Sequence, residues 1–237
     1  EPIIQGIIAP KGGNPDTIHN LDSIDLELSD YNLFSSNRFV GTDRVDEGSK
    51  MNFGFKTTLE LNDHGELTTL IGRSWNLLRP QNEYISGSGL SKKLSHLVGN
   101  IIYDSKDSIV LGYHFRRDSF NLRSQRDTLT VAVDANPIMA NINYTMVRDD
   151  PVPTQSMLSE QAHISLSWNI TDNWSTNIRQ NRDLRNSNWG NALSSYGYIE
   201  FKNECIIIRL QAERKHQNLV DVPDTNEYSL NFNLVGF

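Results

Sequence analysis

The stretch MNFGFKTTLELN, residues 51–62, alternates between two kinds of side chain. Its odd positions carry Met51, Phe53, Phe55, a threonine, Leu59 and Leu61, and its even positions carry polar residues and one glycine. Successive side chains of a strand point to opposite faces, so this spacing predicts a β-strand with one apolar face. At about 11 residues it has the length that a tilted strand needs to cross a bilayer, and roughly twice the length of an ordinary globular strand.

The same alternation recurs through the chain, in residues 109–116, 138–146, 162–170, 206–213 and 228–234. Tight turns rich in Gly, Asn, Asp and Pro are predicted at residues 62–65, 105–107, 135–137, 171–173 and 202–204. Longer polar segments lie between them, at residues 13–48, 79–95, 117–126, 149–159, 185–190 and 216–225. Outer-membrane barrels alternate short periplasmic turns with long extracellular loops in this way. We therefore predict an all-β protein, a transmembrane antiparallel up-and-down β-barrel of about 12 strands, in which residues 13–48 are a long extracellular loop.

Composition narrows the classes of protein. Hydrophobic residues make up 37% of the chain, and no apolar stretch is long enough for a spanning helix. The net charge of -7, without a basic stripe, argues against a nucleic-acid partner. The start at Glu1 shows no signal-peptide pattern, which leaves a mature chain, a cytoplasmic chain or a piece of a longer protein as alternatives. A soluble β-rich binding domain is a further alternative for the fold.

Signatures of catalysis are absent from the sequence: it contains no HExxH, GxSxG or P-loop motif. His114 and His163, with Asp118 or Asp134, would be the residues for a hydrolase site, but wetted interior side chains of a barrel explain them more simply. We expect no catalytic residues, no cofactor and no metal site. The arginines at 116–117 and 179–185 suggest either ion pairs or contacts with anionic head groups. Aromatic residues near the predicted strand ends suggest an interfacial girdle, with Trp75, Tyr84, Tyr103, Tyr113, Tyr144, Trp168, Trp174, Trp189, Tyr196 and Tyr228 as its members.

One region carries a more specific pattern. It reads IHNLDS at residues 18–23, DYNLF at 30–34, NRFVGTDRVDEG at 37–48 and NFG at 52–54. This closely resembles the carboxyl-terminal barrel region of the LptD family, the lipopolysaccharide-assembly proteins. The strand opening at Glu1-Pro2 resembles the strand just upstream in that family, and ECIIIRL at residues 204–210 resembles its penultimate strand.

The resemblance implies that residues 1–237 are the carboxyl-terminal portion of a larger outer-membrane barrel in a Gram-negative bacterium. It implies transport without covalent chemistry, in which lipopolysaccharide passes through the lumen and leaves through a lateral seam. The implied partners are lipopolysaccharide, an LptE-like lipoprotein plug, an LptA-like periplasmic bridge reached through an amino-terminal domain, the barrel-assembly machinery and outer-membrane lipid. We expect a loop-structuring role for the motif residues Asn37, Arg38, Phe39, Gly41, Asp43, Arg44 and Gly48. A small porin or barrel enzyme of about 12 strands is the rival interpretation.

The last strand, residues 226–237, would supply one lip of the seam. Ser229, Asn231 and Asn233 are expected to face the lumen, and Phe237 is the terminal aromatic residue that many outer-membrane proteins carry. Cys205 is the single cysteine of the chain. It either forms a disulfide with a cysteine outside this chain or is a free cysteine of the strand.

Overall fold

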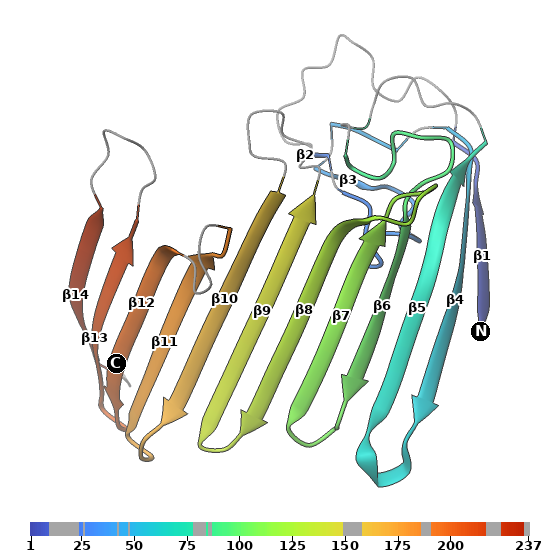
Figure 1. Cartoon of the computed structure of the whole chain (residues 1–237). Coiled ribbons are helices and arrows are strands. Elements are labelled where there is room, and N and C mark those ends of the chain that lie inside the picture. The colour runs from blue at the N-terminus through green and yellow to red at the C-terminus, as the bar shows by residue number, and fades with distance from the viewer. Residues whose placement is uncertain are drawn as a thin grey trace. The chain divides into compact units, whose positions relative to one another are not determined.

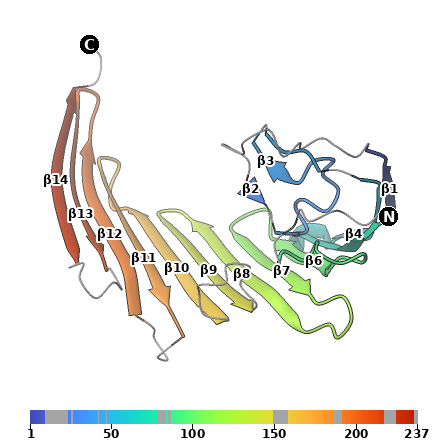
Figure 2. The same cartoon turned by 90° about the horizontal axis from the view of Figure 1, so that it is seen from above.

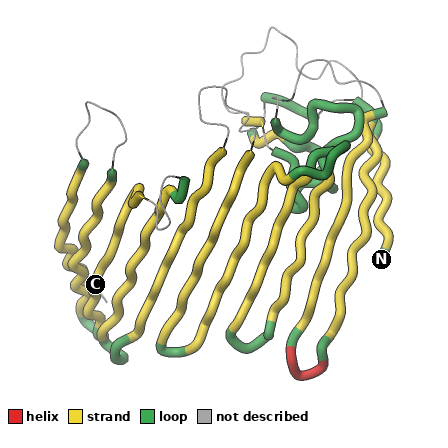
Figure 3. The backbone as a smooth tube through the Cα atoms, in the orientation of Figure 1, coloured by secondary structure: helices red, strands yellow, loops and turns green. Residues whose placement is uncertain are grey.

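The computed structural model describes residues 1–9, 24–25, 27–41, 43–46, 48–77, 84, 87–148, 158–185, 191–216 and 224–234. They form almost only strands and turns (Figures 1 and 3). The strands are β1 (Pro2–Ile7), β2 (Ile24–Asp25), β3 (Phe39–Val40), β4 (Lys50–Glu60), β5 (Glu66–Asn76), β6 (Leu97–Asp104), β7 (Ile109–Arg117), β8 (Ser124–Ala135), β9 (Ile138–Arg148), β10 (Leu158–Asn169), β11 (Trp174–Asp183), β12 (Asn191–Lys202), β13 (Ile206–Lys215) and β14 (Thr225–Leu234).

Twelve of these strands form one sheet, whose order follows the chain from β1 through β4 and on to β14. The register runs without a shift from β4 to β5 and from β12 to β13 to β14, always antiparallel. The predicted all-β, up-and-down antiparallel sheet of about 12 strands is thereby confirmed. No helix among the described residues is long and apolar enough to cross a membrane.

The chain divides into two compact units. Unit 1 contains residues 1–103, 112–127 and 147–158, and unit 2 contains residues 104–111, 128–146 and 159–237. Within unit 1, the short β2 and β3 pair with each other and lie to one side of the β4–β6 part of the sheet (Figure 2). The rest of unit 1 and unit 2 consist of long strands joined by short turns at one end.

The short turns lie where they were predicted. The turn at residues 62–65 contains the short 3-10 helix Asn62–His64, the red segment in Figure 3. The turns at 105–107, 135–137, 171–173 and 202–204 fall between consecutive strands from β6 to β13. The polar segment 117–126 is shorter than predicted, because β7 continues to Arg117 and β8 begins at Ser124. The Asp118 side chain accepts hydrogen bonds from the backbone N–H groups of Phe120 and Asn121, which closes a tight turn there.

Alternation divides the sheet into an apolar face and a polar face. On the apolar face Phe55 is 52% exposed, Leu111 41% and Leu166 42%. Cross-strand pairs continue this face from strand to strand, as Leu166 lies opposite Ile178 in the β10–β11 register. The polar face is continuous in the same way, with Ser167 opposite Asn177.

The two faces are expected to tolerate a charge differently. Leu166→Arg should cost about 2 to 4 kcal/mol if the apolar face meets lipid, because a charge placed there loses its hydration. Ser167→Arg, at the next position of the same strand, should cost less than about 1 kcal/mol. Folding titrations of the two variants in lipid vesicles measure the difference, and equal costs would contradict a lipid-facing surface on this side of the sheet.

Candidate functional site

The polar face of unit 1 is covered at the long-loop end by the segment 27–46, named here the inward segment. Its Leu28 and Leu33 are 1% and 0% exposed and form an apolar core with Leu90 and Val98. Phe34 packs against this core. Residues predicted to belong to a long extracellular loop are therefore packed onto the sheet, where they bury apolar surface.

A pair of glycines makes room for this packing. Gly54 of β4 lies directly opposite Gly72 of β5. A Cβ atom at Gly72 would be 2.5 Å from Leu33 Cδ2, and one at Gly54 would be 3.0 Å from Phe34 Cζ. The absence of side chains at these two positions lets the inward segment approach the backbone of the sheet.

Arg38 connects the inward segment to β4 and β5. Its side chain is 1% exposed, and Nη2 donates to Leu33 O at 3.0 Å, Asn52 Oδ1 at 2.8 Å and Ser74 Oγ at 3.2 Å. Asn52 itself donates to Gln5 Oε1 of β1 at 2.8 Å. One guanidinium group thus holds the inward segment to two strands of the sheet through buried hydrogen bonds.

Asp46 supplies the negative charge of this cluster. Its carboxylate accepts hydrogen bonds from Lys50 Nζ and from the Tyr84 hydroxyl, and Arg38 Nη1 lies 3.9 Å away. Asp46 and Lys50 are 3% and 2% exposed. An ion pair so deeply buried is costly to form and more costly to break, so its members depend strongly on one another.

The motif residues of the inward segment make several local contacts. Asn37 Oδ1 accepts from the backbone N–H of Phe39 at 3.1 Å and of Asp46 at 3.0 Å. The Phe39 ring stacks on Tyr84 with centroids 5.6 Å apart, and the Arg44 guanidinium lies 5.9 Å from the Phe39 ring centroid. Gly41 and Gly48 have φ angles of 100° and 83°, which only glycine adopts without strain. Asp43 is half-buried.

Further charged groups join the inward segment to β6, β7 and β8. Glu27 Oε2 lies 3.1 Å from Arg116 Nη1 and 2.8 Å from Arg126 Nη1. Asp30 Oδ2 lies 2.9 Å from His114 Nδ1 and accepts from Asn100 Nδ2 at 2.7 Å. Gln5 of β1 also donates to Phe34 O at 3.0 Å, so six strands of unit 1 contribute polar side chains that hold the same segment.

These contacts do not assemble a hydrolase site around His114 and His163. His114 contacts Asp30 and, through Nε2, the Tyr31 hydroxyl at 3.1 Å. Asp118 lies instead beside Lys92 at 3.3 Å and His96 at 3.6 Å. His163 Nδ1 lies 2.5 Å from Asn181 Oδ1. No group of three or more His, Cys, Asp or Glu side chains in the described part of the chain is placed to hold a metal ion.

Asp118 is fully ionised at neutral pH. Hydrogen bonds from the backbone N–H groups of Phe120 and Asn121, with help from Lys92, lower the pKa of its carboxyl group to about 2. It therefore neutralises the charge of Lys92 over the whole physiological range of pH.

The polar face of unit 2 pairs arginines with aromatic rings. The Arg179 guanidinium lies 5.7 Å from the Tyr196 ring centroid, and the Arg209 guanidinium lies 4.5 Å from that of Tyr198. Arg209 also forms an ion pair with Glu200 at 2.5 Å. The stretch 179–185 thus contributes both ring contacts and ion pairs, since Arg185 pairs with Asp183 at 2.5 Å.

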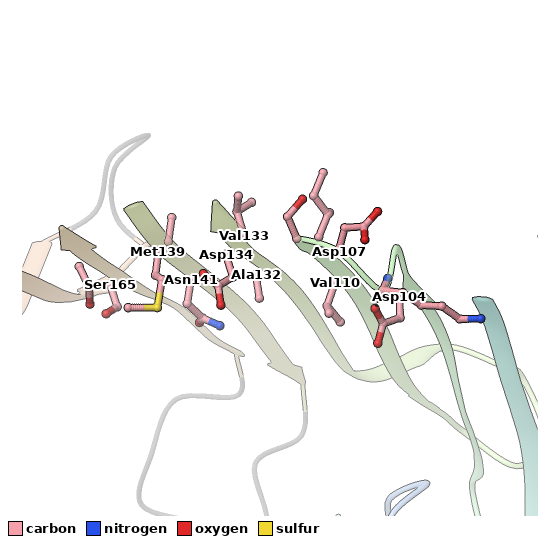
Figure 4. Close-up of a pocket in the computed structure, with 14 residues that line it drawn as sticks. Asp104, Asp107, Val110, Ala132, Val133, Asp134, Met139, Asn141 and Ser165 are labelled. Atoms are coloured by element: carbon pink, nitrogen blue, oxygen red, sulfur yellow. Dashed lines mark hydrogen bonds between the residues drawn. The ribbon is translucent and has the colours of Figure 1, made fainter. Parts of the chain in front are cut away.

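Unit 2 also contains a shallow hollow of about 360 Å³ at its short-turn end. The carboxylates of Asp104, Asp107 and Asp134 lie at this hollow, with Val110 between them and Met139 on the far side of Asp134 (Figure 4). It combines acidic and apolar groups without forming a defined ligand set.

The terminal strand β14 is paired with β13 along its whole length, from Ile206 opposite Leu234 to Lys215 opposite Thr225. Ser229 and Asn231 lie opposite Gln211 and Arg209, which places them on the polar face. The other face of β14 is apolar, and its residues Tyr228, Leu230, Phe232 and Leu234 are 58–75% exposed. Phe237 lies outside the described residues. Cys205 is exposed and lies in the turn before β13 rather than within the strand, and as the single cysteine it has no disulfide partner within the chain.

Comparison with known proteins identifies the family. The family model for LptD, described as LPS transport system D, matches residues 1–174. The chain belongs to the LptD family. The LPS-assembly protein LptD of Vibrio cholerae serotype O1 is 24% identical over 264 aligned residues, which cover 100% of this chain and 33% of that protein. The chain thus spans about a third of the length of this LptD relative.

The structure also shows a buried part of the polar face of this LptD chain, which was not predicted from the sequence. Lys50, Asn52 and Ser74 are at most 2% exposed beneath the inward segment. Two predicted girdle residues lie elsewhere: Tyr84 is in the Asp46 cluster, and Tyr196 is on the polar face. The signal for this burial lay in the quoted motif, since Asp46 falls within it and Lys50 follows four residues later.

Proposed function

We propose that this chain is the carboxyl-terminal part of an LptD barrel that moves lipopolysaccharide to the outer leaflet. Proteins of this family lie in the outer membrane of Gram-negative bacteria. In this proposal, sugars pass along the polar face in the lumen, and acyl chains leave through a lateral seam. The observation that carries the proposal is the family match, together with a terminal strand whose two faces differ so sharply in polarity.

We assign the inward segment to the extracellular end of the lumen. The segment 13–48 is then an extracellular loop, part of which folds back over the polar face. In this arrangement Asn37, Arg38, Phe39, Gly41, Asp43, Arg44 and Gly48 shape the loop, and Arg38 is its main anchor because of its buried bonds to Asn52 and Ser74. The segment covers the outer end of the path without any covalent chemistry.

The proposed partners follow from the family. They are lipopolysaccharide, an LptE-like lipoprotein within the lumen, an LptA-like periplasmic bridge reached through an amino-terminal domain, the barrel-assembly machinery and outer-membrane lipid. Cys205 is a candidate for a disulfide with a cysteine outside this chain, because its thiol is exposed at the short-turn end.

A reversible lock on the terminal strand tests the seam. A cysteine at Ser229 or Asn231, in a Cys205→Ser background of the full-length protein, is paired with a cysteine on the first strand of the barrel. Oxidation is expected to stop the delivery of lipopolysaccharide to the cell surface, and reduction is expected to restore it, because a closed seam blocks the acyl chains. Surface labelling of newly made lipopolysaccharide measures the effect.

The control carries the cysteine of β14 alone, which cannot form the crosslink. Normal delivery by the locked protein would contradict the lateral exit. Barrel assembly is followed separately by the heat-dependent mobility of the folded protein. A narrow ion-conducting pore that is unaffected by the lock would favour the porin interpretation instead.

A further inference from the structure

The apolar face of unit 1 carries an unexpected cation close to the long-loop end of β5. Ile71, Arg73 and Trp75 share this face, and Ile71 and Trp75 are 39% and 41% exposed. A charged side chain in the lipid-facing row of a strand is costly at the bilayer midplane and much less costly near the interfaces. The groups that contact Arg73 therefore determine what its charge does at this position.

Hydrogen bonds fix Arg73 without neutralising it. Its Nη2 donates to the backbone oxygens of Ser95 at 3.1 Å and Ser119 at 3.3 Å. Within the described part of the chain, no carboxylate forms an ion pair with it. The guanidinium group is thus held in place while its positive charge is kept.

A second cation lies beside Trp75, which is two residues further along the same strand as Arg73. Lys93 is exposed, and its Nζ lies 5.8 Å from the centroid of the Trp75 ring. The backbone of this region is joined to β5, because Asn76 N donates to Lys93 O at 2.8 Å. Lys93 too has no carboxylate partner among the residues that the structure describes.

Two other cations nearby are already neutralised. Lys92 pairs with Asp118 at 3.3 Å, and the pKa of Asp118 of about 2 keeps that carboxylate ionised. Arg117 pairs with Asp127 at 2.6 Å. Among the described residues, uncompensated positive charge on this surface therefore remains at Arg73 and Lys93, and at the exposed Arg123 in the turn between β7 and β8.

Exposed apolar side chains lie in the two elements that contact these cations, the turn after Ser119 and strand β5. Phe120, whose ring lies 5.1 Å from Lys92 Nζ, is 78% exposed, and Leu122 in the same turn is 58% exposed. Ile71 and Trp75 continue the apolar surface along β5. A ligand that matches this surface has anionic groups at one end and hydrocarbon chains at the other.

We propose that Arg73 and Lys93 form a binding site for the phosphate groups of a phosphorylated glycolipid in the outer leaflet, whose acyl chains lie along the apolar face of β5. The proposal rests on the assignment of the long-loop end to the cell surface. Arginine and lysine bind phosphate through charge-assisted hydrogen bonds, and cations at a membrane surface strengthen the binding of anionic lipid. The site is on the apolar face of β5, so it is separate from the polar face and from the terminal strand β14.

Native mass spectrometry of the full-length protein tests this site, with bisphosphorylated lipid A as the probe. The double variant Arg73→Ala/Lys93→Ala is expected to bind bisphosphorylated lipid A about tenfold more weakly than the unchanged protein, because both cationic side chains that bind phosphate are removed. The matched control Lys56→Ala/Lys202→Ala removes two exposed cations elsewhere and is expected to bind normally. Lipid A without phosphates should bind the unchanged protein as weakly as bisphosphorylated lipid A binds the double variant.

Further variants separate a lost ligand from a lost fold. Lys93→Glu changes only an exposed side chain and should weaken binding, whereas Arg73→Lys keeps the positive charge and should weaken binding less than Arg73→Ala does. Equal retention of lipid A by the unchanged protein and the double variant, or displacement of lipid A by millimolar inorganic phosphate, would overturn the proposal. If the double variant loses lipid A and delivery of lipopolysaccharide continues, the site stands independently of the seam. If the double variant keeps lipid A while the seam lock blocks delivery, this site is wrong and the proposed transport stands.

Discussion

Replacing Asp46 with alanine is expected to lower the free energy of unfolding by about 3 to 5 kcal/mol. The substitution removes the carboxylate that binds Lys50 and Tyr84 and that lies 3.9 Å from Arg38. Two buried positive charges would then remain without their counterion, and the cost of an uncompensated buried charge is large. The inward segment is expected to detach from the polar face so that Arg38 and Lys50 regain water.

Urea titration of the full-length protein, refolded in lipid vesicles, measures this loss. Limited proteolysis at residues 27–46 follows the detachment of the segment. Glu213→Ala is a suitable control, because Glu213 and its partner Lys215 are 32% and 57% exposed as side chains. Its cost should stay below about 1 kcal/mol. Similar costs for the two variants would show that the Asp46 cluster does not hold the segment.

Replacing Gly72 with alanine is expected to cost about 2 kcal/mol, through overpacking rather than through lost contacts. The new Cβ would lie 2.5 Å from Leu33 Cδ2 and 2.7 Å from the backbone oxygen of Phe53. Leu33 can move away from this clash, but the backbone of the neighbouring strand cannot. The inward segment is therefore expected to be displaced while the strands of the sheet stay paired.

The displacement is measured by the rate of protease cleavage within residues 27–46 and by the urea midpoint of unfolding. Gly197→Ala is the matched control, since a Cβ there would be 3.5 Å from its nearest neighbour, Asn177 O. Alanine at that position should be neutral or slightly stabilising, because glycine weakens a strand. If Gly72→Ala leaves the rate of protease cleavage in the inward segment unchanged, the Gly54–Gly72 pair is not what allows the segment to pack on the sheet.

Much of the sheet could be predicted from local pattern. The alternation around Phe55 and around Leu166 is a property of neighbouring residues, and any strand places such side chains on opposite faces. Turn residues such as those at 62–65 and 171–173 act over two to four positions. The number of strands and their antiparallel order followed from these local signals, because consecutive strands joined by short turns pair with each other.

The environment of the polar face could not be predicted in this way. Asn52 and Ser167 look alike in the sequence, yet Asn52 is 0% exposed and Ser167 is half-buried. The difference arises from contacts between residues far apart, such as Arg38 with Ser74, which are separated by 36 positions. The motif of residues 37–48 indicated a structured loop. The alternation of apolar and polar residues, however, does not specify whether such a loop folds back over the sheet.

The sequence by itself determined the strands, their order and the two faces of the sheet, because strand periodicity and turn chemistry depend only on near neighbours. Only the tertiary structure decided that the inward segment covers the polar face, with Arg38 and Asp46 buried beneath it. It also decided which cations keep their charge free, since Lys92 is neutralised by Asp118 and Lys93 is not neutralised by any described residue. The physical reason is that burial and ion pairing are set by distances in space, which a linear pattern of residues does not specify.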